Sequence, residues 1–68
     1  MVTFHDVQFI DSVTIGGKPV FRYRKEGSCL SADSKPTGSD IYNGSVLIEM
    51  DTKKGYLYDA QNSTWREV

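Results

Sequence analysis

Cysteine and histidine are almost absent from this chain of 68 residues, which has one of each, Cys29 and His5. A single cysteine excludes an intrachain disulfide, and a single histidine leaves a zinc site dependent on carboxylates or on neighbouring chains. A chain this short buries a small fraction of its surface, so its core has little margin over conformational entropy. Small folds usually gain stability from disulfides, metals or other subunits. We therefore expect no cofactor, and we expect self-association or docking on a larger assembly.

Long hydrophobic runs and an imbalance of charge are also lacking. The longest fully aliphatic run, Val46-Leu47-Ile48, is far shorter than the about 20 residues of a membrane-spanning helix. The segment Met1-Val2-Thr3-Phe4-His5-Asp6 has neither the basic nor the apolar part of a secretory signal. Net charge is −1, so no basic excess favours nucleic acid as a partner. We expect synthesis in a reducing cytoplasm and no membrane association.

What is present is a strand pattern, first over residues 1–25. Apolar residues alternate with polar ones, and Gly16-Gly17 predicts a hairpin turn, since paired glycines allow positive φ. The alternation changes parity along the first strand, which predicts a bulge near His5-Asp6 or near Asp11-Ser12. The second strand places its aromatic residues on one face and its arginines on the other.

Residues 26–40 interrupt the strand pattern with serine, glycine, proline and charge. A polar stretch of this length is long for a connection inside a compact domain. Two interpretations stay open, a linker between two β units and an arm that becomes ordered on a partner.

Residues 41–68 predict a three-stranded antiparallel meander. Turn residues at Asp51 to Gly55 and at Ala60 to Thr64 separate three short apolar segments, and Asn43-Gly44 fits a type I′ turn. The chain is thus expected to be a single all-β domain, a small antiparallel sheet made of an N-terminal hairpin and this meander. Its expected core consists of Val46, Ile48, Met50, Tyr56, Tyr58 and Trp65.

The sequence offers few residues that could carry out catalysis. A Cys29 nucleophile would have only His5 as its base, and a half-buried thiol on a loop is the better interpretation. Asp51 and Asp59 flank turns, where carboxylates usually accept hydrogen bonds from backbone amides. We therefore expect no enzyme activity.

Aromatic and basic residues are the remaining candidates for a binding role. The arginines and rings after the hairpin turn faintly resemble a single-strand nucleic-acid binder. Strand alternation places the rings and the guanidinium groups on opposite faces of the strand, which argues against this role. The rings of the meander suit either a core or a platform for sugars or peptides. The candidate interaction residues are Phe21, Arg22, Tyr23, Arg24, Tyr42, Tyr56, Tyr58 and Trp65.

The C-terminal half resembles small structural proteins of tailed bacteriophages and prophages. The resemblance lies in Asn43-Gly44-Ser45-Val46-Leu47-Ile48-Glu49-Met50-Asp51-Thr52, in Gly55-Tyr56-Leu57-Tyr58-Asp59 and in Trp65, preceded by Asp33-Ser34-Lys35-Pro36-Thr37. It implies a module of the tail-fibre, head-fibre or decoration type, which assembles as a homo-oligomer and carries no catalytic residues.

The expected function is therefore that of a non-enzymatic phage or prophage virion protein. It would act by β-mediated oligomerisation or by docking on a capsid or tail protein, in the virion, after synthesis in the bacterial host cytoplasm. Two alternatives stay open: a small carbohydrate- or peptide-binding β module that uses exposed aromatics, and a phage protein that binds a host factor.

Overall fold

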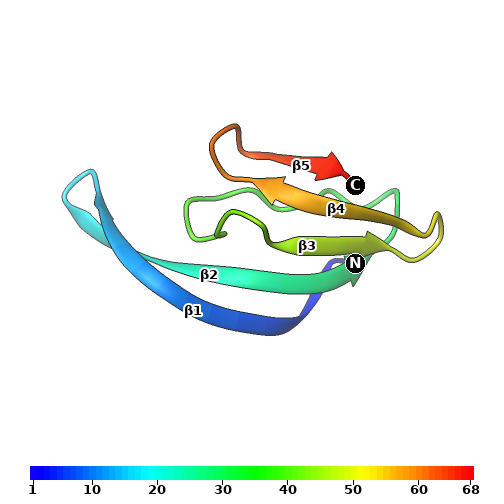
Figure 1. Ribbon diagram of the computed structural model, residues 1–68, viewed down its shortest axis with the longest axis horizontal. Coiled ribbons are helices and arrows are strands. Elements are labelled where there is room, and N and C mark those ends of the chain that lie inside the picture. The colour runs from blue at the N-terminus through cyan, green and yellow to red at the C-terminus, as the bar shows by residue number, and fades with distance from the viewer.

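The computed structural model describes all residues 1–68 as five strands. These are β1 (Thr3–Ile15), β2 (Lys18–Cys29), β3 (Val46–Glu49), β4 (Lys54–Asp59) and β5 (Thr64–Glu67). They form a single sheet in the order β1-β2-β3-β4-β5 (Figure 1). The prediction of an all-β chain with an N-terminal hairpin and a C-terminal meander is confirmed. The chain contains no helix that could span a membrane.

The β1–β2 hairpin is long and bends at two bulges. Gly16 and Gly17 make its turn with φ angles of 59° and 78°, as the paired glycines predicted. The register shifts between Phe4 and Asp6 and again between Phe9 and Asp11. The first bulge therefore lies at the predicted place, and the second lies one residue before it. Each bulge reverses the facing of the side chains that follow, which explains the change of parity in the sequence.

Strand β2 joins the hairpin to the meander. It continues to Cys29, beyond the expected end near Lys25, and its last four residues pair with β3 in parallel. The other three strand pairings are antiparallel. Since parallel neighbours need a connection that crosses back along the sheet, residues 30–45 must return the chain to the start of β3. Both halves of the chain thus share one sheet.

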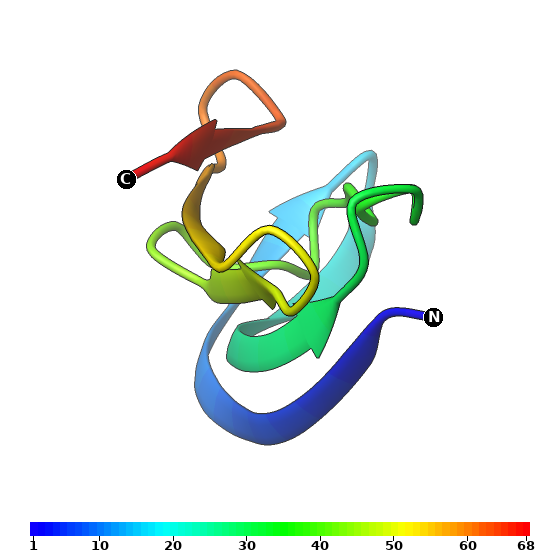
Figure 2. The ribbon, with the colours of Figure 1, turned by 90° about the vertical axis from the view of Figure 1, so that its right-hand side faces the viewer.

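Residues 30–45, here named the strap, are held against one side of this sheet (Figure 2). Tyr23 donates its backbone N–H to Asp40, and Tyr42 donates its own to Tyr23, which adds an isolated parallel bridge beside β2. Further along, the indole N–H of Trp65 donates to the Pro36 carbonyl at 2.8 Å. The polar segment is therefore ordered on the sheet of its own chain.

The core lies between the strap and the β2–β3–β4 strands. Leu47 is completely buried, and Cys29, Ile41 and Tyr58 expose at most 4% of their surface. The prediction that Val46, Ile48 and Met50 face the core is wrong: Ile48 and Met50 are 45% and 62% exposed. The predicted alternation assigns the residues of β3 to two faces correctly. The face that becomes the core is the other one, because the strap covers Leu47 and Glu49.

Candidate interaction surfaces

The aromatic residues after the hairpin turn form an exposed surface. Phe9 lies across from Tyr23 in the β1–β2 register, with ring centroids 5.7 Å apart, and its ring is 6.3 Å from that of Phe21. Phe9 and Phe21 are both more than half exposed. We name Val7, Phe9, Phe21 and Tyr23 the hairpin surface. Phe9 was not among the predicted interaction residues, although the glycine turn together with the bulge between Phe9 and Asp11 places it opposite Tyr23.

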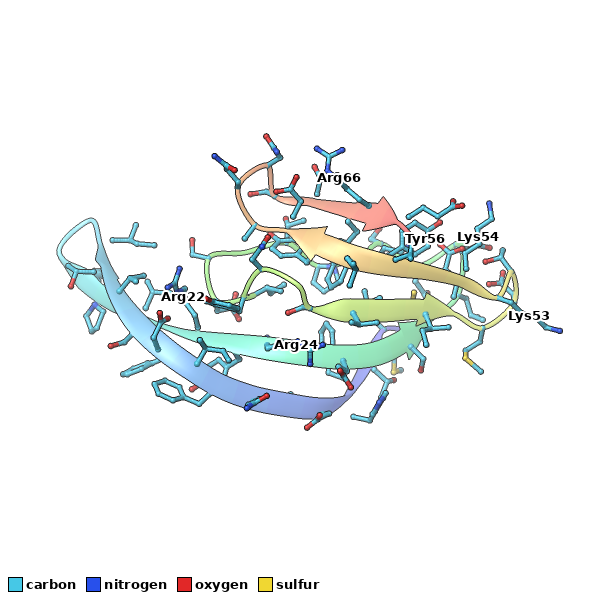
Figure 3. All side chains as sticks on the ribbon, in the orientation of Figure 1. Arg22, Arg24, Lys53, Lys54, Tyr56 and Arg66 are labelled. Atoms are coloured by element: carbon cyan, nitrogen blue, oxygen red, sulfur yellow. The ribbon has the colours of Figure 1, made fainter.

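The two arginines of β2 lie on the opposite face, as the alternation predicted (Figure 3). Arg22 makes two hydrogen bonds to the Asp11 carboxylate, at 2.6 and 2.5 Å, and its guanidinium lies 5.0 Å from the Tyr42 ring. The hydrogen bond from Arg22 lowers the pKa of Asp11. Arg24 pairs with Glu26 at 2.7 Å. These arginines are therefore engaged by carboxylates of the hairpin itself.

The rings of Tyr56, Tyr58 and Trp65 lie on the strap side of the meander. Tyr58 packs against Trp65 with ring centroids 4.9 Å apart, and its hydroxyl accepts a hydrogen bond from the Gly38 N–H at 3.3 Å. The Lys35 ammonium lies 4.5 Å from the centre of the Tyr56 ring. Tyr58 is buried and Trp65 is half-buried. These rings thus hold the strap, in agreement with the prediction that they belong to the core.

A buried ion pair fastens the strap at the other end of the meander. Lys35 bonds to Glu49 at 2.6 Å, and the Thr52 hydroxyl donates to the same carboxylate at 2.6 Å. Side-chain exposure is 16% for the lysine and 6% for the glutamate. The hydrogen bond from Lys35 is the main cause that lowers the pKa of Glu49, and burial raises the pKa of the nearby Cys29 thiol. A carboxylate with two donors is a structural group, which explains why a charged residue occupies this inward position.

The meander side away from the strap carries five apolar residues, which we name the open face: Val46, Ile48, Met50, Leu57 and Val68. Val46 pairs with Leu57, and Ile48 pairs with Gly55, whose neighbour in the sheet is Val68 through a backbone hydrogen bond of 2.9 Å. Side chains of paired residues lie on the same side of a sheet, so these positions are contiguous. Of the five, Ile48, Met50, Leu57 and Val68 rank among the exposed large hydrophobic residues of the chain.

Charged residues lie at both edges of the open face. Glu26 on β2 pairs in register with Val46, and Arg66 on β5 pairs with Leu57. Arg66 donates its Nε to Asp59 at 2.8 Å. Hydrogen bonds from Asn62 and from Arg66 lower the pKa of Asp59 to about 2. The row Glu26–Val46–Leu57–Arg66 therefore has an apolar centre between an acidic end and a basic end.

One cleft separates the hairpin tip from the strap. Its volume is about 410 Å³, and its lining includes Val13, Ile15, Arg22, Ile41 and Tyr42. This volume lies within the usual range for small-molecule sites, about 300–1,000 Å³. Arg22, which is bonded to the Asp11 carboxylate, forms part of one wall.

No group of three or more His, Cys, Asp or Glu side chains is placed to hold a metal ion. Comparison with protein-family models, with curated proteins and with solved structures finds no match for this chain.

Proposed function

We propose that the chain is a non-enzymatic assembly module, which acts by burying its sheet surfaces against other protein subunits. The observation that carries this proposal is the distribution of its large apolar side chains. Ten of them are exposed, whereas the buried hydrophobic residues number four. Contiguous exposed apolar surface on a small protein marks interaction sites.

The exposed residues are gathered rather than scattered. The hairpin surface and the open face together contain Val7, Phe9, Phe21, Ile48, Met50, Leu57 and Val68 from that set of ten. A standard interface takes about 800 Å² from each partner. The chain has 4542 Å² of accessible surface, so such an interface would cover about a sixth of it.

The setting we propose for this assembly is the virion of a tailed phage or prophage. It is supported by the resemblance of the C-terminal half to small phage structural proteins. A capsid or tail protein, or further copies of the chain, would then supply the covering surface. Synthesis in the host cytoplasm suits the single cysteine, which lies buried as a free thiol.

Sedimentation velocity tests the proposal most directly. We expect the purified chain to associate reversibly across about 1 to 500 µM, and its melting temperature to rise with concentration, because association stabilises the folded state. A chain that stays monomeric over this range, with a constant melting temperature and no capture by purified virion components, contradicts the proposed function.

A second candidate function is the binding of a small polar ligand, such as a sugar or a peptide end, in the cleft beside Tyr42. It is favoured by the volume of the cleft and by the ring that Arg22 holds in place at 5.0 Å. Glycan and peptide panels titrated against the chain, with Tyr42→Ala as the control variant, test this role. Binding that is unchanged in Tyr42→Ala assigns the ligand to another surface.

A further inference from the structure

We propose that the open face is the contact between two copies of this chain, which stack their meander sheets face to face about a two-fold axis parallel to the strands. The inference rests on the proposed assembly function and specifies its first contact. Three features carry it: an apolar centre, opposite charges at the two edges, and the strap, which leaves only one side of the meander accessible.

The apolar centre has the shape that sheet stacking requires. Val46 and Leu57 lie opposite each other in neighbouring strands, and Ile48 and Val68 flank Gly55, where a Cβ would meet nothing within 4 Å. Gly55 therefore places no side chain between these two branched residues. Stacked sheets lie about 10 Å apart with interdigitated side chains, and a position without a side chain beside projecting residues allows this packing.

The strap settles which side of the meander can be stacked. Its bonds from Pro36 and Gly38 to the rings of Trp65 and Tyr58 occupy the other side. Figure 2 shows the first part of the strap, in green, on that side of the strands β3, β4 and β5. A second copy can therefore approach the meander sheet through the open face alone.

The charges at the edges select the second copy as the occupant. Glu26 and Arg66 belong to the same row, but Glu26 lies on β2 and Arg66 on β5, with β3 and β4 between them. Figure 3 labels Arg66 and also Arg24, which lies two residues before Glu26 on β2. Glu26 uses one carboxylate oxygen to bind Arg24, and Arg66 uses Nε to bind Asp59. The second oxygen of Glu26 and the terminal nitrogens of Arg66 make no hydrogen bond within the chain. Each of the two residues thus keeps hydrogen-bonding atoms for a second partner, beside the ion pair that it already makes within its own chain.

A two-fold axis brings these halves together only in one orientation. Rotation about an axis that runs along the strands between β3 and β4 places β2 of one copy over β5 of the other. Glu26 then faces the partner's Arg66, and the pair occurs twice, as a closed isologous interface requires. Rotation about an axis across the strands would instead place edges of the same strand and the same charge together. Charge complementarity therefore favours the first arrangement.

Charge reversal in trans tests this geometry. Glu26→Arg and Arg66→Glu are prepared as single variants, and the dimer dissociation constant of each is measured by sedimentation velocity. We expect each variant alone to dimerise about tenfold more weakly, because two like-charged contacts replace two ion pairs. An equimolar mixture of the two variants should recover wild-type affinity, since both contacts of the mixed dimer then join opposite charges.

The mixture separates this contact from effects inside each monomer. Glu26→Arg disturbs Arg24, and Arg66→Glu disturbs Asp59, but mixing leaves both disturbances unchanged. Recovery on mixing can therefore come only from contacts between copies. Lys18→Glu, at the far hairpin tip, serves as the control for a change of net charge and should leave dimerisation unchanged.

Two variants at apolar positions test whether association uses the open face or the hairpin surface. They therefore separate the two-fold contact from the assembly function in general. Ile48→Lys on the open face should weaken the dimer by about a hundredfold, whereas Phe21→Ser on the hairpin surface should leave it intact. Association that is lost in Phe21→Ser and kept in Ile48→Lys, or no recovery in the mixture, overturns the two-fold contact while the assembly function stands. A wild-type chain that never associates overturns both.

Discussion

Leu47 and Ile48 are neighbours on β3, and their replacement by alanine distinguishes the two sides of the meander. Leu47 is completely buried beneath the strap, whereas Ile48 is 45% exposed on the open face. In the sheet Leu47 lies between Gly27 of β2 and Tyr56 of β4. We therefore expect Leu47→Ala to lower the free energy of unfolding of the monomer by about 2–5 kcal/mol, the range for a fully buried leucine.

That loss is large for so small a protein. Domains are stable by about 0.05–0.15 kcal/mol per residue, which for this length corresponds to a total of about 3–10 kcal/mol. One kcal/mol shifts the melting temperature of a domain of this size by about 4–8 °C, so Leu47→Ala should lower it by at least about 8 °C or unfold the chain. Ile48→Ala removes a half-exposed side chain and should cost about 1 kcal/mol.

The assay is thermal and urea unfolding followed by the fluorescence of Trp65, the single tryptophan. The protein should be at or below about 1 µM, so that association does not add to the measured stability. An Ile48→Ala variant that loses as much stability as Leu47→Ala would refute the burial described for β3, and with it the one-sided position of the strap.

Three further outcomes follow from single contacts. Gly27→Ala should destabilise the fold by about 1–3 kcal/mol, because its Cβ would meet the backbone of β1, whereas Gly55→Ala, in open space, should be neutral or slightly stabilising in urea titrations. The pKa of Asp59 in the fold, about 2, lies below its ordinary value of 3.8, so its charge stabilises the fold above pH 3.8 and this contribution is lost as the pH falls towards 2. Asp59→Asn should therefore flatten the dependence of stability on pH in that window. Trp65→Phe removes the indole donor to the strap, and the buried Cys29 should then react about fivefold faster with a disulfide reagent in rate measurements.

Turns and strand alternation were the features most accessible to sequence reasoning. The Gly16-Gly17 pair determines the hairpin because glycine adopts positive φ at little cost, and the structure has this turn. Asp51 and Asp59 accept hydrogen bonds from the backbone N–H groups of Thr52 and Asn62 in the two meander turns, as their positions predicted. At Asn43-Gly44 only the glycine has positive φ, so the expected type I′ turn does not form.

The pairing of β2 with β3 was beyond the sequence pattern. Residues 26–29 combine charge, glycine and serine, so no apolar alternation marks them as strand. Their strand state comes from neighbours on both sides: β1 pairs with them from one edge and β3 from the other. Gly27 is required there because Phe4 and the Thr3 carbonyl lie where its side chain would be. A contact of this kind depends on tertiary approach and leaves no local periodicity.

The error at β3 has a related cause, and it bears on function. Val46, Ile48 and Met50 are more apolar than Leu47 and Glu49, so hydrophobicity alone assigns the former to the core. The structure inverts this choice because Lys35, supplied by a polar segment, neutralises the inward Glu49. This sheet exposes the most apolar side chains of β3 and uses an ion pair to bury a carboxylate. Such an arrangement is not optimised for an isolated monomer. Contiguous exposed apolar surface marks interaction sites, and the charges of Glu26 and Arg66 at its edges are the reason why we propose a second copy of the same chain as its cover.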